Sequence, residues 1–579
     1  MNIAVTGYGI ISAIGNNADE TLSSLLAKQS GVSSMRYLQS VHDDLPVGEV
    51  KLSNAQLKDM LGITPERIIS RTTLLGAVAV RQALDAASYT AADLQGKRVA
   101  FISGTTVGGM DVTESLFTSM CESDEHLSYI GKHDCGSNSE EIAEICGLHD
   151  VEVSTISTAC SSALNAIIVG CEMLKRDEVD IVIAGGTEAL SKFHLNGFNM
   201  LMILDHEQCR PFDSTRAGLN LGEGAAYLVL EKDKEQAKAY ISGYGNRCDA
   251  FHQTATSDDG EGAYLAMSDA LKMAALSPDD IDYVNAHGTG TPNNDISESV
   301  ALQRVFGNAM PPVSSTKSFT GHTTSASGSI ETVISILAMQ NGFIPANIGW
   351  KNQIEGGITP SLGCENAELN HVVCNSFGFG GNDSSIIISK NLLVNSEQKL
   401  CFNTEFTSEF IVDDIAQLSD LKEFVSPMQS RRMGKLMKAA TLSSLKALQA
   451  AGVECPDAII TGTAYGMLET SEKFLKEMID NGEESLSPTL FMQSTHNTIG
   501  SAIAIRTKCH GYNITYTQGE ASLEWALRDA RRLIETGKAE TVLVGVHDES
   551  TPQFDDFCKR MGKEIPKQIY SRSIVIKKL

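Results

Sequence analysis

Several features that mark whole classes of protein are missing from this 579-residue sequence. No apolar run is long enough to span a bilayer, and no run of basic residues occurs. The formal net charge of -26 argues against nucleic-acid binding, although a local basic patch would still serve an acidic partner. The thirteen cysteines are scattered without a C-x-x-C pair, which fits a reducing cytosol better than a disulfide framework. We expect a soluble, cytoplasmic protein with no nucleic-acid partner and no membrane insertion.

The start of the chain leaves no room for a signal peptide, because M-N-I-A-V-T-G-Y-G goes almost directly into a strand and a glycine turn. We expect a buried strand over residues 2–6, broken by Gly7, Gly9 and Gly15, and a helix over residues 20–27. The segment G-Y-G-I-I-S-A-I-G lacks the G-x-G-x-x-G spacing of a dinucleotide-binding loop. No dinucleotide site is predicted here.

Residues 153–188 predict a strand, a sharp turn, a buried helix and a second strand, with Cys160 where the turn becomes the helix. Leu164, Ile167 and Leu174 recur at helical spacing behind it, so this helix buries a face. A thiol at a helix N-terminus meets unpaired backbone N–H groups and the positive end of the helix dipole, and both favour the thiolate. Cys160 is therefore a candidate nucleophile, weighed against the more common case of a small buried cysteine.

Three motifs with chemically capable side chains follow predicted strands later in the chain. They are H-G-T-G-T-P after the strand at 281–286, K-S-F-T-G-H after 312–315 and G-F-G-G-N-D after 374–377. In α/β sheets the ends of strands are where sites form. A single histidine is more often structural than catalytic, but His287 and His322 occur together at such ends.

The chain repeats part of itself. Residues 514–550 overlay residues 154–190 without a gap, at a constant offset of 360. The unit is far longer than a solenoid repeat, so we interpret it as a duplicated half-domain. The second copy has no counterpart of the histidine motifs or of G-F-G-G, and it carries Glu520 at the position of Cys160.

The order of these motifs resembles that of the β-ketoacyl-acyl-carrier-protein synthases over about residues 1–391. The resemblance rests on V-T-G-Y-G, T-A-C-S-S, R-P-F-D…G-E-G-A, N-A-H-G-T-G-T-P-N-N-D, K-S-F-T-G-H and N-S-F-G-F-G-G. It is closest to the elongating type, which has a Cys-His-His triad, whereas initiating synthases carry an asparagine as the third residue. The family implies an α/β thiolase fold, layered αβαβα with two related halves, here followed by a third, incomplete thiolase-like half.

On this resemblance we divide the chain into four parts. These are a ketosynthase N-terminal half with the cysteine nucleophile (1–250), a C-terminal half with the histidine motifs (251–391), a linker (392–398) and a catalytically silent N-terminal-half-like domain (399–579).

The resemblance implies that Cys160 takes an acyl chain from its carrier as a thioester. It also implies that His287 and His322 donate hydrogen bonds to the charge that develops when a malonyl group loses carbon dioxide. The substrates are acyl and malonyl thioesters on the phosphopantetheine arm of acyl-carrier protein, and that carrier is the expected partner. No metal and no further cofactor are expected.

Other motif residues resemble supporting parts of the same machinery. Phe379, flanked by Gly378 and Gly380, is similar to the gate between the thiol and the acyl tunnel, and its N–H would join that of Cys160 in an oxyanion hole. Lys317 and Glu331 resemble a buried charged pair that steadies the histidines.

Four residues near these motifs receive separate interpretations. Asp295 and Glu298 are expected to hydrogen-bond the H-G-T-G-T loop. Arg67 and Arg71 either contact an acidic carrier or, as we favour, lie on a solvated helix face.

The family usually has a threonine and an asparagine after the glycines of G-F-G-G, so the segment G-G-N-D departs from the family pattern at Asn382 and Asp383.

The second copy resembles a chain-length-factor-like partner, as in aryl-polyene and polyketide systems. Glu520 cannot hold an acyl thioester. It is interpreted as a buried polar residue at the helix N-terminus, with mimicry of a malonyl carboxylate as the alternative. Because condensing enzymes dimerise through their N-terminal halves, we hypothesise that this copy docks where a second subunit would, giving an intramolecular pseudo-dimer in place of a homodimer.

The predicted function is that of a 3-oxoacyl-[acyl-carrier-protein] synthase in fatty acid or polyketide, possibly aryl polyene, biosynthesis. Two alternatives stay open at this point. One is a scaffold that binds acyl-carrier protein without elongating. The other is a thiolase-like acyltransferase, which the family pattern disfavours because thiolases carry a second catalytic cysteine.

Overall fold

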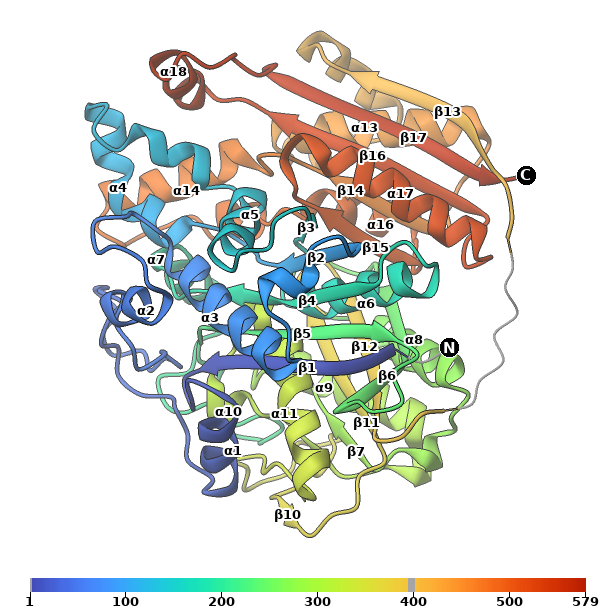
Figure 1. The fold of residues 1–579 in the computed structure, drawn as a ribbon. Helices are drawn as coiled ribbons and strands as arrows, with labels where there is room; N and C mark the ends of the chain where they lie inside the picture. The colour runs from blue at the N-terminus through green and yellow to red at the C-terminus, as the bar shows by residue number, and fades with distance from the viewer. Residues whose placement is uncertain (1–2, 394–400) are drawn as a thin grey trace.

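The computed structural model describes residues 3–393 and 401–579. Most of the predicted linker, residues 394–398, lies outside the described residues. No helix in the described part of the chain is long and apolar enough to cross a bilayer. The principal sheet has 15 strands in the order β13-β17-β16-β14-β15-β3-β2-β4-β5-β1-β6-β12-β11-β7-β8 (Figure 1). The chain builds this sheet in three consecutive sections of five strands, each with its own helices.

The first section contributes β3-β2-β4-β5-β1 to the sheet. Its elements are β1 (Ile3–Ser12), α1 (Ala18–Leu26), α2 (Asn54–Leu61), α3 (Arg71–Ala86), β2 (Val99–Gly104), α4 (Met110–Glu122), α5 (Cys135–Ile145), β3 (Glu152–Ile156), α6 (Ser162–Lys175), β4 (Ile181–Glu188), α7 (Lys192–Met200) and β5 (Gly224–Lys232). The predicted helix near residues 20–27 is confirmed by α1, and the strand–turn–helix–strand around Cys160 is confirmed by β3, α6 and β4.

The second section continues the sheet through β6-β12-β11-β7-β8. Its elements are β6 (Ala239–Cys248), α8 (Glu261–Ala274), β7 (Tyr283–Asn285), α9 (Pro292–Phe306), β8 (Val313–Ser314), α10 (Lys317–Thr320), α11 (Ser327–Asn341), β11 (His371–Gly378) and β12 (Asn382–Ser389), with a separate two-stranded sheet of β9 (Phe343–Ile344) and β10 (Cys364–Glu365). Helix α3 packs on β1 and β5, α8 packs on β6 and β12, and α6 and α11 contact each other. This is the expected layered α/β fold with two related halves.

The third section, residues 401–579, is called the half-copy below. Its elements are β13 (Thr404–Val412), α12 (Pro427–Ser430), α13 (Lys435–Ala451), β14 (Ala458–Gly462), α14 (Leu468–Asp480), α15 (Pro488–Met492), α16 (Thr498–Thr507), β15 (Tyr512–Tyr516), α17 (Ser522–Glu535), β16 (Thr541–Glu549), α18 (Pro552–Arg560) and β17 (Ile569–Lys578). Its strand order, β13-β17-β16-β14-β15, mirrors β1-β5-β4-β2-β3 of the first section. The structure therefore confirms the duplicated half-domain.

Short 3-10 helices complete the chain. They are η1 (Ala91–Leu94), η2 (Leu127–Lys132), η3 (Pro278–Asp280), η4 (Gly307–Ala309), η5 (Thr324–Ala326), η6 (Ile415–Glu423) and η7 (Gly519–Ala521).

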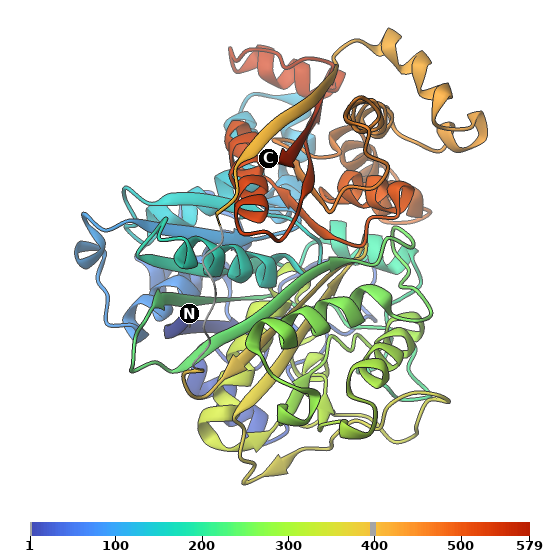
Figure 2. The same ribbon diagram turned by 90° about the vertical axis from the view of Figure 1, so that its right-hand side faces the viewer.

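The two copies meet edge to edge through β3 and β15, which run antiparallel. Ile156 pairs with Tyr516, its own counterpart at the repeat offset. The N–H of Ser157 donates to the carbonyl of Thr515 at 3.0 Å, and the N–H of Thr517 donates to the carbonyl of Thr155 at 2.8 Å. These reciprocal bonds relate the two edge strands by an approximate two-fold axis, and the half-copy lies beside the first section along this edge (Figures 1 and 2).

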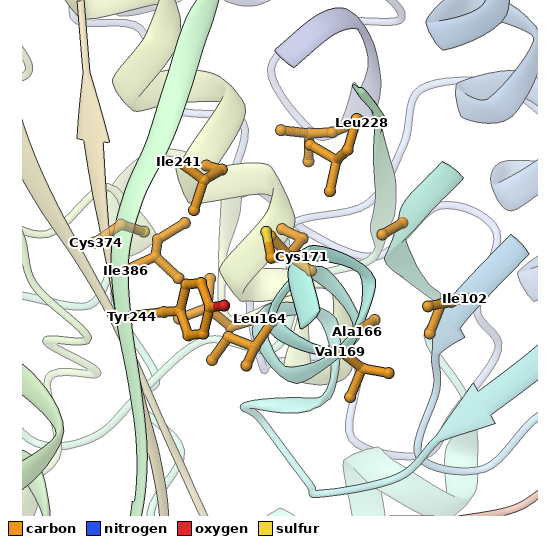
Figure 3. Packing of buried hydrophobic residues seen from close by; sticks show 14 of the residues in the cluster. Ile102, Leu164, Ala166, Val169, Cys171, Leu228, Ile241, Tyr244, Cys374 and Ile386 are labelled. Atoms are coloured by element: carbon orange, nitrogen blue, oxygen red, sulfur yellow. The ribbon is translucent and has the colours of Figure 1, made fainter. Parts of the chain in front are cut away.

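Helices α6 and α17 show how the same element is adapted to two surroundings. All but the last residue of α6 are buried, and Leu164, Cys171 and their neighbours pack against Ile241 and Ile386 of the second section (Figure 3). The half-copy has no such section to cover α17. Glu524 and Arg531 of α17 are exposed, while its other face is buried. With polar residues on its outer face, α17 can face solvent at the position where α6 is covered by the second section.

Two predictions about the first section are wrong. Gly7 and Gly9 do not end the first strand, because β1 runs through both. A Cβ at Gly9 would lie 2.1 Å from the carbonyl oxygen of Ala79, so these glycines admit the close approach of helix α3. Helix α3 begins at Arg71, and Arg71 is buried against Glu223 instead of lying on a solvated helix face. Its Nη2 lies 2.7 Å from Oε1 of Glu223.

Candidate active site

Cys160 lies in the tight turn between β3 and α6. Ala159 has a φ of 52°, in the left-handed region. Ser162 ties the turn: its hydroxyl accepts from the N–H of Thr158 at 2.9 Å and donates to the carbonyl of Ala159 at 2.6 Å. Cys160 is 5% exposed and lines a cavity of about 380 Å³. The turn therefore presents a buried thiol to an internal space.

The histidines and Phe379 converge on this thiol from three other segments. His287 follows β7, His322 follows α10 and Phe379 follows β11. The Nε2 atom of His322 lies 3.0 Å from the sulfur of Cys160, and the two imidazole rings are 5.4 Å apart and nearly perpendicular. The backbone N–H groups of Phe379 and Cys160 lower the pKa of the Cys160 thiol, against the larger effect of burial. All four residues line the same cavity, so the structure brings the predicted set together.

Hydrogen bonds orient the imidazole of His322 and the backbone of the loop that carries His287. The Nδ1 atom of His322 lies 3.0 Å from the hydroxyl of Ser327, which leaves Nε2 directed at the thiol. Glu298 accepts from the backbone N–H of His287 at 2.8 Å, and Asp295 accepts from the backbone N–H of Gly290 in the same loop at 3.1 Å. The predicted structural roles of Asp295 and Glu298 are confirmed.

Lys317 and Glu331 form a buried ion pair, and the charge of Lys317 acts on the two histidines. The Nζ atom of Lys317 lies 2.5 Å from Oε1 of Glu331, and both side chains are almost inaccessible. Burial and the charge of Lys317 hold the pKa values of His287 and His322 well below their ordinary range. Both imidazoles are therefore neutral near pH 7 and available as hydrogen-bond donors.

The thiol is not ionised in the resting protein, contrary to the expectation from helix geometry. Burial raises the pKa of Cys160 to about 12, while Lys317 and the N–H of Phe379 oppose that rise. Desolvation outweighs the helix N-terminus because Cys160 is only 5% exposed. In the resting protein Cys160 is therefore a thiol and His322 a neutral imidazole.

Phe379 separates the main cavity from a much smaller space of about 30 Å³. Its ring stacks on Phe198 with centroids 5.7 Å apart. Phe193 and His194 of α7 line the small space together with Phe491 and its neighbours from the half-copy. The half-copy thus supplies one wall of the space behind the predicted gate.

The flanking glycines bring the Phe379 backbone close to the nucleophile turn. A Cβ at Gly378 would lie 2.5 Å from the carbonyl oxygen of Thr158, so any larger residue would push the loop away. Gly380 has a φ of 90°, which favours glycine. These two positions explain why G-F-G is needed here.

Glu520 lies where the repeat places it, but its predicted environment is wrong. The residue is exposed, not buried, at a cavity of about 470 Å³ between the half-copy and the η2–α5 segment. The turn around it keeps the hydrogen bonds of the first copy, because Ser522 accepts from the N–H of Gln518 at 2.9 Å and donates to the carbonyl of Gly519 at 2.7 Å. The second copy therefore keeps the strand–turn–helix fold, but an exposed glutamate takes the place of the buried cysteine.

Sequence reasoning missed residues that the half-copy brings to the site. Phe491 lines the space behind Phe379, and Asn497 and Ser501 bond the Phe379 loop. No motif marks them, since their role depends on how the two copies dock. Among the described residues no group of three or more histidine, cysteine, aspartate or glutamate side chains is arranged to hold a metal ion.

Comparison with known proteins agrees with this geometry. The chain matches the N-terminal domain of the β-ketoacyl synthases over residues 1–236 and their C-terminal domain over residues 238–351. A second match to a β-ketoacyl synthase N-terminal domain covers residues 412–570. The half-copy therefore matches an N-terminal domain alone.

A relative and a solved structure each match about two thirds of this chain. A 3-oxoacyl-[acyl-carrier-protein] synthase 2 from Vibrio cholerae serotype O1 is 30% identical over 412 residues, which cover 67% of this chain and 99% of the relative. The ketosynthase ApeO, solved in complex with its chain length factor ApeC from Xenorhabdus doucetiae, is 31% identical with a TM-score of 0.59, over 67% of this chain and 98% of that one.

The PfaC keto synthase–chain length factor covers all of this chain and is itself covered to 78%, with a TM-score of 0.79. At 18% identity it shows the shared fold alone. The paired half-domains, the motif order and these matches lead to one conclusion: the chain belongs to the β-ketoacyl synthase family of condensing enzymes, as a ketosynthase fused to a second N-terminal-type domain.

Proposed function

We propose that the protein elongates acyl chains as a 3-oxoacyl-[acyl-carrier-protein] synthase. The observation that carries the proposal is the 3.0 Å contact between Nε2 of His322 and the sulfur of Cys160, with the N–H of Phe379 directed at the same sulfur. A nucleophile, a proton acceptor and an oxyanion donor therefore meet at one atom.

In the first half-reaction the sulfur of Cys160 bonds to the acyl carbonyl carbon. Its proton passes to Nε2 of His322 and from there to the departing carrier thiol, so the carrier leaves neutral. The N–H groups of Phe379 and Cys160 stabilise the negative carbonyl oxygen in between. The small space behind Phe379 receives the acyl chain, and the half-copy limits its depth through Phe491.

In the second half-reaction the bond between the malonyl α-carbon and its carboxylate breaks and carbon dioxide is released. The electron pair stays on the thioester as an enolate, whose oxygen accepts hydrogen bonds from neutral His287 and from neutral His322 in the tautomer that carries its proton on Nε2, with the Ser327 hydroxyl donating to Nδ1. The enolate carbon bonds to the acyl carbonyl carbon, and the sulfur of Cys160 leaves as a thiolate that takes up a proton from solvent to restore the thiol. The elongated 3-oxoacyl chain remains on the carrier. Burial, and after it the charge of Lys317, lowers the pKa values of both imidazoles and keeps them neutral.

Acyl-carrier protein is the proposed partner and its phosphopantetheine arm carries both substrates, with no other cofactor. The cavity supports an arm that enters past Met202, which is 87% exposed at its rim. The fused half-copy favours a specialised polyene or polyketide pathway, because ordinary elongation does not need it. A thiolase-like reaction is disfavoured, since neither cavity at Cys160 is lined by a second cysteine.

Mass spectrometry of the intact protein after incubation with acyl-carrier protein tests this function. Wild type is expected to gain one acyl group at Cys160, and to release a 3-oxoacyl product when malonyl-carrier protein is added. The Cys171→Ala variant, which lacks a buried cysteine of the same helix, is the matched control and should still be acylated. A wild-type protein that never gains the acyl group, beside an active control synthase, would contradict the proposal.

A further inference from the structure

The half-copy holds the loop that carries Phe379. The side-chain amide of Asn497, directly before α16, donates to the carbonyl of Phe379 at 2.8 Å and to Oδ1 of Asn382 at 2.7 Å. The hydroxyl of Ser501, one turn further along α16, donates to the carbonyl of Gly380 at 2.8 Å. Two consecutive carbonyls of the loop are therefore fixed by side chains from another domain.

The same loop carries the backbone N–H that faces the reaction. The N–H of Phe379, which lowers the pKa of the Cys160 thiol, shares a planar peptide unit with the carbonyl of Gly378, and this carbonyl accepts from the N–H of Gly381 at 3.0 Å. The N–H of Gly381 in turn shares a planar peptide unit with the carbonyl of Gly380, to which Ser501 donates. Fixing the carbonyl of Gly380 therefore restricts the direction of the N–H of Phe379, while Asn497 fixes the neighbouring carbonyl of the loop. The half-copy thus acts on the nucleophile through this loop as well as through Phe491.

The loop needs an external restraint. Gly380 and Gly381 have φ values of 90° and 75°, and glycine gives the backbone many alternative conformations. Asn382, at the other end, is itself tied to the half-copy, since its amide donates to the carbonyl of Asn513 at 2.9 Å. Without these bonds the loop would lose much of its preference for one conformation.

Asn497 is used for this contact and for little else. Both donor bonds of its side-chain amide go to the loop segment, and its Oδ1 is buried without a hydrogen-bond partner among the described residues. Asn497 is 1% exposed and Ser501 is fully buried. A buried amide with an unsatisfied oxygen is costly for the fold, which points to a benefit at the site it contacts.

We propose that Asn497 and Ser501 are positioning residues that set the oxyanion hole of Cys160, so that the half-copy controls acyl transfer directly and not only the depth of the acyl space. The inference rests on the proposed function of Cys160. It assigns the half-copy a role in the chemical step: it holds the N–H of Phe379 at the place where the oxyanion forms.

The test compares three alanine variants of the full chain. Asn497→Ala and Ser501→Ala remove the two bonds to the loop. Ser444→Ala is the matched control, because Ser444 is equally buried on a helix of the half-copy and bonds only Ser573 within it, at 3.0 Å. Thermal unfolding of all three variants shows whether each remains folded.

Acylation of Cys160 by acyl-carrier protein is measured in single turnovers. Misplacing one oxyanion donor should slow acylation by roughly 10- to 100-fold in both Asn497→Ala and Ser501→Ala. The apparent KM for the acyl carrier should change less than about two-fold, because the contact acts on the transition state. Ser444→Ala should acylate like wild type even if its unfolding temperature falls.

Alkylation of Cys160 by iodoacetamide at fixed pH gives a second readout that needs no acyl carrier. Loss of the N–H of Phe379 should lower the alkylation rate in Asn497→Ala but not in Ser444→Ala. Equal acylation and alkylation rates in Asn497→Ala and wild type would overturn the inference and leave the proposed function standing. Wild type that alkylates in an Asn497-dependent manner yet never acylates would contradict the proposed function alone.

Discussion

Ile156 and Tyr516, which occupy equivalent positions in the two copies, pair with each other across the approximate two-fold axis. One chain thereby forms a sheet contact between two copies of the same half-domain. The half-copy closes the β3 edge of the catalytic sheet and buries Trp525 and Tyr516 against the core of the first section.

The full chain should therefore be a monomer. Light scattering after size-exclusion chromatography should give one chain of 62.1 kDa per particle. A fragment ending at residue 393 exposes the β3 edge and the apolar surface beneath the half-copy, so it should dimerise or precipitate. A stable dimer of full chains joined through β3, or a monomeric fragment, would contradict this arrangement.

His322→Ala should slow acylation of Cys160 by about 10²- to 10⁴-fold, because the thiol, with a pKa of about 12, loses its proton acceptor at 3.0 Å. Single-turnover acylation followed by mass spectrometry measures the effect. His547→Ala is the control, since His547 is also a buried imidazole and lies on β16 in the half-copy. Acylation of His322→Ala at the wild-type rate would remove His322 from the mechanism.

Lys317→Met should destabilise the fold by about 3–5 kcal/mol, because it leaves the carboxylate of Glu331 buried without its cation. Chemical denaturation measures this loss, and Lys317→Met combined with Glu331→Gln should recover much of it.

The double variant also tests the charge at the histidines. Lys317 lowers the pKa values of His287 and His322, so its removal raises both toward their ordinary range. The acid limb of the kcat profile should then move to higher pH, although burial, the larger cause, remains. An acid limb at the wild-type position would show that Lys317 does not act on the histidines.

The convergence of Cys160, His287, His322 and Phe379 on one cavity was predictable because each lies in a short motif, and the order of these motifs resembles that of the β-ketoacyl synthases. The fold was predictable for the same reason. The repeat offset even identified Glu520 as the counterpart of Cys160. The protonation state of Cys160, the burial of Arg71 and the continuity of β1 were not predictable in this way. Each depends on how closely other elements pack, as does the contact of Asn497 with Phe379.

Phe491→Ala should lengthen the acyl chains that Cys160 accepts. Phe491 lines the space of about 30 Å³ behind Phe379 and contacts the ring of Phe198, so truncation opens room at its end. Acylation rates with carriers of increasing chain length measure the change, and the optimum should move to longer chains. Phe554→Ala is the control, because Phe554 lines the cavity at Glu520 instead. An unchanged optimum would mean that the chain leaves the site by another route.

Glu520→Gln should leave both stability and condensation nearly unchanged. Glu520 is exposed, so removing its charge should alter the free energy of unfolding by less than about 0.5 kcal/mol. A malonyl mimic would need a desolvated carboxylate beside hydrogen-bond donors equivalent to His287 and His322, and the repeat carries no such histidine motifs.

Carbon dioxide release from malonyl-carrier protein distinguishes these two roles for Glu520. The Cys160→Ala variant removes condensation, and Glu520→Gln is then compared in that background. We expect the same residual decarboxylation with and without Glu520, because His287 and His322 are intact in both. A drop on Glu520→Gln would instead assign decarboxylation to the half-copy, and the exposed carboxylate would have to become covered when the carrier binds.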